Sequence, residues 1–162
     1  MSLTLPYDSR PVAKPTPPTL PSGQSIRWRS FVSLHIEGDS GGATIDDVLI
    51  DTGAVDITLR ADLAPLIGVT FIPHPKRAKW QFIWAGKKHK IDYGKITLEL
   101  EDASGAKLHW DAVVGFVKAP IPYSGFPGQS GFLEFLNATF DGPNKNLILD
   151  PTPAFPGMFI PQ

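Results

Sequence analysis

Hydrophobic and polar residues alternate along most of the chain, in short runs that are separated by turn residues. In residues 95–101, for example, Ile96, Leu98 and Leu100 occupy every second position. A period of two is typical of β-strands, because successive side chains point to opposite faces. The strands predicted in this way lie at about residues 28–36, 43–50, 55–59, 80–84, 89–93, 95–101, 108–117, 138–140 and 146–149.

Helical patterns are scarce. Residues 130–136 are the best candidate, with Ser130 as the N-cap, and residues 60–67 predict a single helical turn that Gly68 ends. Many short strands at this spacing are typical of a small, mostly antiparallel β-barrel or a sandwich. We therefore predict an all-β protein, a small closed antiparallel barrel with one short C-terminal helix. No internal repeat is present.

Proline divides the chain into three parts. Of 17 prolines, 6 lie in residues 1–25 and 8 lie in residues 120–162, so the middle is the natural place for regular strands. We expect an extended N-terminal arm at residues 1–25, one domain at residues 26–150 and a tail at residues 151–162. The tail contains the apolar residues Phe155, Met158, Phe159 and Ile160. It is either a docking segment, which would contact a partner protomer in a dimer, or a disordered tail.

Composition limits the classes of function. A length of 162 residues suits one domain, and a net charge of -1 is unlike a nucleic-acid-binding protein. The absence of Cys excludes disulfides and thiolate metal sites. No apolar run is long enough to span a bilayer, and no signal peptide is evident at residues 1–10. We therefore expect a cytoplasmic, bacterial protein with no nucleic-acid or membrane partner.

Two groups of titratable residues do not by themselves predict a site. Lys87, Lys88 and Lys90 form a short basic run, which is typical of a solvated edge strand. The four histidines, at positions 35, 74, 89 and 109, are not spaced as metal ligands, so we expect neither a metal nor a cofactor.

One motif joins an apolar strand to a tight turn at residues 48–54, which read VLIDTGA. Asp51 directly follows the apolar run, where burial disfavours its charged form, and such perturbed acids are often used in catalysis. Gly53 lets the chain turn tightly and bring its N–H toward the carboxylate. Thr52 offers a hydroxyl that can reach a neighbouring copy. The alternative is an ordinary turn, in which Asp and Gly are common.

This motif and its surroundings resemble the retropepsin-like aspartic proteases, the single-domain retroviral-type family, in a bacterial-type form. Asp56, Thr58 and Leu59 also fit the family. Residues 93–96 resemble the strand after its flap, and residues 128–133 resemble its glycine-then-helix element. Order and spacing agree over residues 31–149. The resemblance implies a barrel-like half-enzyme, whose homodimer places the two Asp51 side chains together around the water that attacks the substrate.

The resemblance also implies roles for single residues. Asp51, Thr52 and Gly53 would form the catalytic triplet of each chain, and Ala54 and Asp56 would bind substrate. Counting back from the tyrosine at position 93 puts the flap tip, which would cover the substrate, at three residues, Trp84, Ala85 and Gly86. The indole of Trp84 either closes over a substrate side chain or packs on its own domain.

The chemistry explains why two copies are needed. Hydrolysis of a peptide by water needs a carboxylate as base and a carboxylic acid as proton donor, and two close carboxyls that share one proton supply both. Each chain holds one such motif, since Asp141 and Asp150 lack the preceding buried strand and the Thr-Gly pair. We therefore predict an aspartic endopeptidase that acts on peptide or protein substrates as a homodimer and is inactive as a single chain.

Two departures from the family pattern keep other hypotheses open. Val55 and Gln129 stand where family members often carry an acidic residue and an arginine, whose ion pair supports the dimer. Since both are uncharged, no charge is stranded, and we interpret them as signs of a rearranged interface. A third difference lies just before Gly128, the glycine of the glycine-then-helix element. Where the family usually has a pair of apolar residues, this chain has Phe126 and Pro127. The alternative is a catalytically silent retropepsin-like dimerisation or peptide-binding module. An unrelated ligand-binding barrel would leave the order of the matched elements unexplained.

Overall fold

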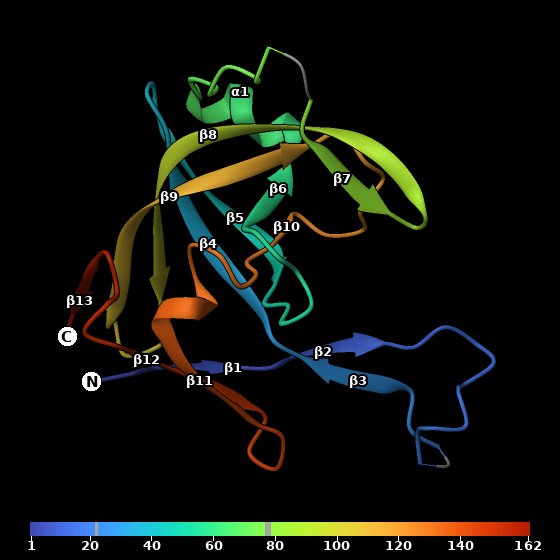
Figure 1. Cartoon of the computed structure of the whole chain (residues 1–162). Helices are drawn as coiled ribbons and strands as arrows, with labels where there is room; N and C mark the ends of the chain where they lie inside the picture. Colours follow the sequence, from blue (N-terminus) through green and yellow to red (C-terminus); the bar gives the residue numbers. More distant parts are fainter. Residues whose placement is uncertain (22, 77–78) are drawn as a thin grey trace.

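The computed structural model describes residues 1–21, 23–76 and 79–162. It is mostly β, as predicted, with one short α-helix (Figure 1). The strands are β1 (Leu3–Pro6), β2 (Asp8–Pro11), β3 (Ile26–Arg29), β4 (Phe31–Glu37), β5 (Gly42–Leu49), β6 (Thr58–Arg60), β7 (Gln81–Trp84), β8 (Lys87–Glu101), β9 (Lys107–Val117), β10 (Gly125–Phe126), β11 (Leu136–Asp141), β12 (Asn146–Pro151) and β13 (Met158–Ile160).

Eight strands form the main sheet in the order β13-β9-β6-β10-β5-β4-β8-β7, and β8 pairs with β9 as well as with β4. The sheet therefore curves strongly (Figure 1). The predicted strands at residues 89–93 and 95–101 are one continuous strand, β8, because pairing with β9 continues through Gly94. The alternating side chains of this strand face the core: Ile96 is 3% exposed, and Leu98 and Leu100 are each 1% exposed.

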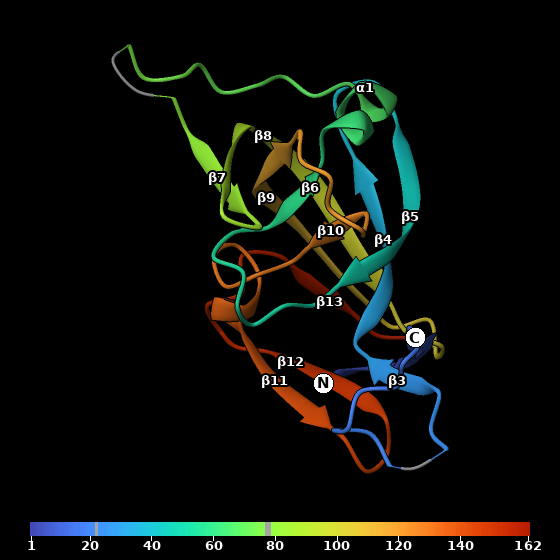
Figure 2. The same ribbon diagram turned by 90° about the vertical axis from the view of Figure 1, so that its right-hand side faces the viewer.

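A smaller sheet and a hairpin lie below the main sheet. The smaller sheet has the order β1-β12-β11, and β2 pairs with β3 in a separate two-stranded hairpin (Figure 2). The N-terminal arm thus contains two strands that the sequence did not predict. The described residues between β2 and β3, 12–21 and 23–25, are rich in proline and belong to the end of this hairpin, which projects from the body (Figure 1). The tail returns to its own chain, since Met158 of β13 lies opposite His109 of β9.

The helix predicted at residues 130–136 is wrong. Only a short 3-10 turn, η2 (Leu133–Phe135), forms there. The chain does not turn into a helix there, because Gly131 has a φ of 82° and Phe132 has a φ of -141°, both outside the helical region. The α-helix, α1 (Ala64–Ile67), follows the 3-10 turn η1 (Ala61–Leu63), where a single helical turn was predicted. Gly68 ends it with a φ of 65°.

Candidate active site

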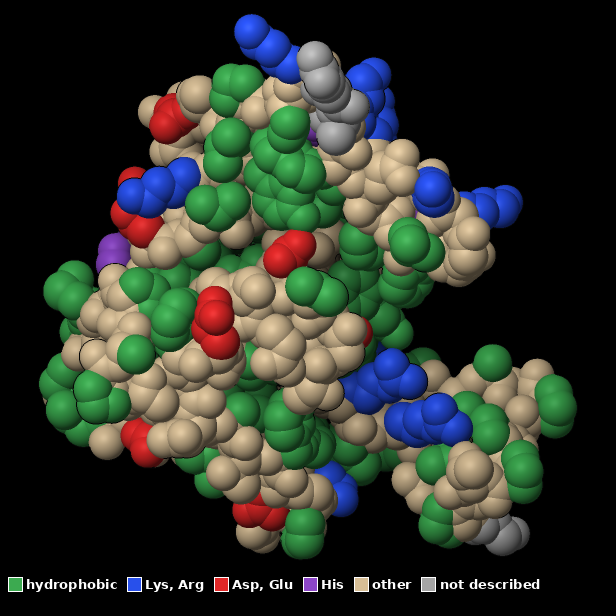
Figure 3. Space-filling view, in the orientation of Figure 1, with side chains coloured by type: hydrophobic (Ala, Val, Ile, Leu, Met, Phe, Trp, Pro, Cys, Tyr) green, Lys and Arg blue, Asp and Glu red, His purple; other side chains and the backbone are tan. Residues whose placement is uncertain are grey.

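A cleft of about 480 Å³ lies between the Asp51 turn and the hairpin formed by β7 and the start of β8. We call residues 81–91 the flap hairpin. Five of the eight predicted site residues line the cleft, namely Asp51, Gly53, Ala54, Asp56 and Trp84. The other three, Thr52, Ala85 and Gly86, are exposed and do not line it. The space-filling view shows a deep indentation beneath this hairpin (Figure 3).

The Asp51 turn is held by its own backbone. The N–H of Gly53 donates to Oδ1 of Asp51 at 2.8 Å, and the N–H of Ala54 donates to the Asp51 carbonyl at 3.2 Å. The preceding Ile50 is buried, with 4% of its surface exposed. Asp51 itself is half-buried rather than enclosed, because it follows the last residue of the strand in a turn. The hydrogen bond from Gly53 fixes the position of one carboxylate oxygen.

A second loop, residues 127–130, runs alongside this turn. The carbonyl of Pro127 accepts from the N–H of Asp51 at 3.1 Å, and the N–H of Gln129 donates to the carbonyl of Ala54 at 3.0 Å. Gly128 permits the close approach: a Cβ there would stand 2.4 Å from the carbonyl oxygen of Ala54. A side chain at this position would therefore push the two loops apart. The glycine-containing element singled out in the sequence thus lies against the Asp51 turn.

The two departures from the family pattern lie on the exposed rim of this turn. The amide Nε2 of Gln129 donates to the carbonyl of Thr52 at 3.1 Å. Val55 is 71% exposed on this rim. Gln129 therefore bonds to the backbone of the turn, where an arginine in the family would pair with an acid.

Asp56 is bonded at the side of the cleft. The hydroxyl of Tyr93 donates to Oδ2 of Asp56 at 2.7 Å. Burial, together with this hydrogen bond and the negative charge of Asp56, raises the pKa of Tyr93 well above its usual range. Tyr93 thus keeps its proton at ordinary pH and remains a donor, so that one oxygen of Asp56 is fixed. The sequence did not predict this bond, which joins residues 37 positions apart.

Removing that hydroxyl tests its contribution to the fold. Tyr93→Phe is expected to lower the free energy of unfolding by about 1–2 kcal/mol, because a half-buried carboxylate loses a donor. Urea denaturation measures the change. Tyr7→Phe is the matched control, since within the described residues the Tyr7 hydroxyl forms no side-chain hydrogen bond. Equal losses in the two variants would contradict the assigned role of the Tyr93–Asp56 bond.

The flap hairpin turns at Ala85 and Gly86, which have φ values of 49° and 74°. This is the tip position that the sequence predicted. The indole of Trp84 packs on the ring of Phe126 with a centroid distance of 5.5 Å. Of the two roles considered for Trp84, docking on its own domain is thus the arrangement seen in the single chain. The indole still lines the cleft.

Sequence reasoning missed most of the apolar wall of the cleft. Phe82, Ile91 and Phe126 line it beside Trp84. Strand alternation could have placed Phe82 with Trp84, and Ile91 with Tyr93, on common faces. The contribution of Phe126 depends on β10 pairing with β5 and β6, for which no local signal exists.

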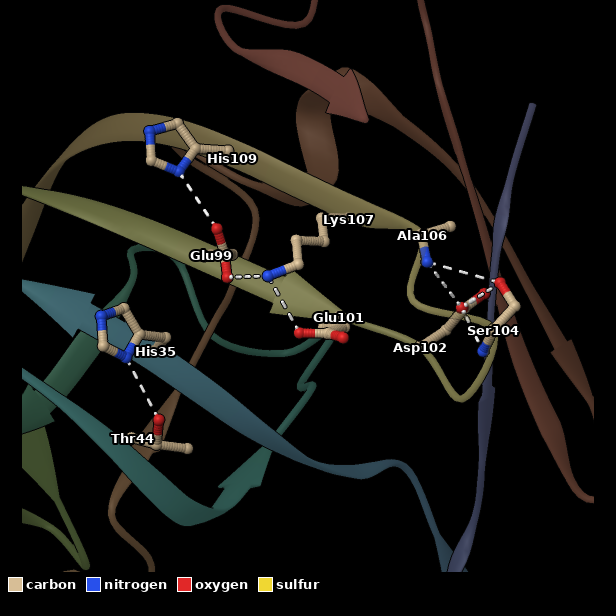
Figure 4. Close-up of polar contacts among 9 residues, drawn as sticks. All are labelled: His35, Thr44, Glu99, Glu101, Asp102, Ser104, Ala106, Lys107 and His109. Carbon is tan, nitrogen blue, oxygen red and sulfur yellow. Dashed lines mark hydrogen bonds and ion pairs between the residues drawn. The ribbon is translucent and has the colours of Figure 1, made fainter. Parts of the chain in front are cut away.

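The histidines lie outside the cleft lining. His109 belongs to a polar network with Glu99 and Lys107, and His35 forms a separate contact with Thr44 (Figure 4). His109 lies 3.5 Å from Glu99, which also pairs with Lys107 at 2.9 Å. Across residues 1–21, 23–76 and 79–162, no three His, Asp or Glu side chains are grouped in a way that could hold a metal ion.

The same view shows Asp102 holding the β8–β9 turn together (Figure 4). Burial raises the pKa of Asp102, but hydrogen bonds from Ser104, Thr4 and Ala106 outweigh it and bring the pKa below its usual range. Thr4 belongs to β1, so this carboxylate also ties the N-terminal strand to the main sheet.

The lowered pKa of Asp102 predicts a pH-dependent contribution to stability. Asp102→Asn is expected to cost about 1–2 kcal/mol of unfolding free energy at neutral pH. The stabilisation is present above the unfolded pKa and is lost as pH falls through the lower folded pKa. The difference between wild type and variant should therefore shrink below about pH 4. Thermal denaturation at several pH values measures it, and a difference that grows toward acid would contradict this assignment.

Comparison with models of known protein families gives no match, and comparison with curated proteins gives none either. Among the described residues, no helix combines the length and the apolar character that crossing a membrane requires. The case for a function therefore rests on the sequence motif and on the geometry of the cleft.

Proposed function

We propose that the protein is a retropepsin-like aspartic endopeptidase that acts as a homodimer, with one Asp51 from each chain in a shared active site. The observation that carries the proposal is the placement of Asp51, which is held by the Gly53 N–H at the edge of a cleft beneath a hairpin. The curved sheet, in which β8 pairs with both β4 and β9, supports a small closed barrel of the family's type.

The proposed reaction uses two carboxyls that share one proton. The ionised Asp51 takes a proton from water as the water oxygen bonds to the peptide carbonyl carbon, and the protonated Asp51 of the partner subunit gives its proton to the carbonyl oxygen. Collapse of the tetrahedral intermediate breaks the C–N bond. The leaving nitrogen takes the proton that Asp51 received from water, and the hydroxyl formed from the carbonyl oxygen returns its proton to Asp51 of the partner subunit, so that the pair again shares one proton. The flap hairpin would exclude water from the cleft during these steps.

The surface around Asp51 supports association with a second copy. Thr52, Gly53 and Val55 are exposed next to the carboxylate. An exposed Thr hydroxyl and an apolar Val on one rim can pair with the same residues of another protomer across a two-fold axis.

Ala54 predicts the pH range of activity. In the related two-domain pepsins, the residue after Asp-Thr-Gly is usually Ser or Thr, whose hydroxyl can donate to the carboxylate and lower its pKa. Ala54 has no hydroxyl, so the pair should hold its shared proton to higher pH than a pepsin pair does. We expect a bell-shaped profile of kcat/KM with a mildly acidic to near-neutral optimum, which suits the expected cytoplasmic setting.

Ala54→Ser is expected to move this bell toward acid, because the new hydroxyl favours the ionised carboxylate. The measurement is the pH profile of kcat/KM for both forms on one peptide. A wild-type optimum as acidic as that of pepsin, or a variant profile displaced toward alkali, would show that the account of the carboxyl pair is wrong.

A second candidate function is a peptide-binding module without catalysis. The uncharged Val55 and Gln129, together with the docking of Trp84 on Phe126, favour it. Incubation with a denatured protein at mildly acid pH, with and without a statine-type inhibitor, separates the two. Cleavage that the inhibitor blocks supports the protease, whereas binding of the denatured protein without cleavage supports the module.

A further inference from the structure

Charge is distributed very unevenly along this nearly neutral chain. Residues 63–91, which include the flap hairpin, contain six of the 15 Lys and Arg residues and none of the 16 Asp and Glu residues. The rest of the chain therefore holds nine basic residues against 16 acidic ones. The sequence pattern at Lys87, Lys88 and Lys90 predicts a solvated edge, but the structure places this edge at the mouth of the cleft.

The flap lysines stand beside residues of the cleft wall. Lys87 lies opposite Trp84 and Lys88 lies opposite Ile83 in the β7–β8 register, and both Trp84 and Ile83 line the cleft. Residues opposite each other in an antiparallel pair share a face, so that Lys87 projects on the side of Trp84. Successive side chains alternate between faces, so that Lys88 projects with the exposed Ile83 on the other face of the hairpin. Lys90 is already paired with Asp92 at 2.9 Å.

A second group of basic residues lies on the β2–β3 hairpin. Arg29 of β3 approaches the hydroxyl of Tyr123 at 3.5 Å, and the ring of Tyr123 packs on Phe126 of the cleft wall with a centroid distance of 5.6 Å. Lys and Arg side chains accordingly gather above and below the indentation, over the flap hairpin and over the β2–β3 hairpin (Figure 3).

These basic side chains lack acidic partners within the protein. Among the described residues, no ion pair joins Lys87, Lys88 or Arg29 to an Asp or Glu. The floor of the cleft has the opposite charge, since it carries the carboxylates of Asp51 and Asp56 among apolar side chains. The site therefore has a cationic rim around an apolar and anionic floor.

We infer that this cleft selects acidic polypeptides, whose Asp and Glu side chains bind Lys87 on one side and Arg29 on the other; this inference rests on the proposed function. An extended peptide can place apolar side chains on the floor and carboxylates at the rim, which matches the charge pattern. A nucleic acid suits the site less well, because its phosphates would meet the carboxylates of Asp51 and Asp56.

The test separates binding from cleavage. Fluorescein-labelled peptides with a common apolar centre, flanked on both sides by Glu, Gln or Lys, are titrated with the Asp51→Asn variant, and binding is followed by anisotropy. The Glu peptide is expected to bind about tenfold tighter than the Gln peptide, since each exposed charge pair contributes about two- to fivefold. The preference should weaken between about 0.05 M and 0.5 M salt.

Variants of the rim assign the preference to the named residues. In the Asp51→Asn background, Lys87→Gln and Arg29→Gln combined should abolish the preference for the Glu peptide. Lys88→Gln, at an exposed lysine on the other face of the same hairpin, should preserve it. Equal binding of the Glu and Gln peptides would overturn the inference. So would a preference that survives the double substitution, or displacement of the Glu peptide by a single-stranded oligonucleotide that binds more tightly.

The same peptides given to the wild-type protein test the proposed function separately. If the Glu peptide binds preferentially but no peptide is cleaved, the proposed protease activity fails while the inferred preference stands. If peptides are cleaved with equal kcat/KM whatever their flanking charge, the preference fails while the protease activity stands.

Discussion

Asp51→Asn is expected to abolish proteolysis while it leaves the fold intact. The amide has nearly the same shape as the carboxylic acid and can still accept the 2.8 Å hydrogen bond from the Gly53 N–H. It can neither take a proton from water nor share one with a second carboxyl, so kcat/KM should fall by at least about a thousandfold. The measurement is peptide cleavage, with thermal denaturation to show that the variant is folded.

Asp150→Asn provides a matched control for this substitution. Asp150 follows the buried Leu147 and Leu149 in β12, so the expectation that no buried strand precedes it is wrong. It lacks the Thr-Gly pair, however, and it does not line the cleft. Its variant should keep activity close to that of wild type. Activity near wild type in the Asp51→Asn variant would instead remove Asp51 from the mechanism.

Val55→Asp is expected to weaken the homodimer by about a hundredfold or more. The side chain is 71% exposed on the single chain and lies on the rim that we propose is covered in the dimer. A carboxylate buried there without a partner is strongly destabilising. Sedimentation or light scattering over a range of concentrations measures the dimer Kd, and proteolysis should fall in parallel.

A second substitution is expected to restore the dimer affinity that Val55→Asp removes. Adding Gln129→Arg to Val55→Asp restores the ion pair that family members often carry, so dimer affinity and activity should recover. Val113→Asp is the control, because Val113 is also exposed, at 50%, but lies on β9 opposite Lys95 and does not line the cleft. Equal weakening by Val55→Asp and Val113→Asp, or no weakening by either, would contradict the proposed interface.

The sequence predicted the strands that bury one face. Ile96, Leu98 and Leu100 alternate with polar residues. The predicted strand is confirmed in β8, where each of these apolar side chains is buried in the core. The N-terminal strands could not be predicted in this way. Leu3 of β1 pairs with Leu149 of β12, and the short run at residues 3–6 carries no local pattern that reveals so distant a partner.

The helix predicted at residues 130–136 fails to form because of contacts with a distant part of the chain. Residues 130–136 have acceptable local helix signals, but Ser130 pairs with Asp56 and the next two residues, Gly131 and Phe132, have non-helical φ values. The position of Asp51 at the end of a buried strand followed from local pattern alone. The Tyr93–Asp56 bond and the wall formed by Phe126 depend on how distant strands are arranged, which local periodicity does not encode.

The central claim is that two chains share one active site, and mixing tests it most directly. Wild-type protein is equilibrated with increasing amounts of Asp51→Asn variant, and the cleavage rate per wild-type chain is measured. At a ninefold excess of variant, random pairing leaves only about one tenth of wild-type chains with a wild-type partner, so that rate should fall to about one tenth. A rate per wild-type chain that stays constant across the titration, under conditions where subunit exchange is demonstrated, would contradict the shared site.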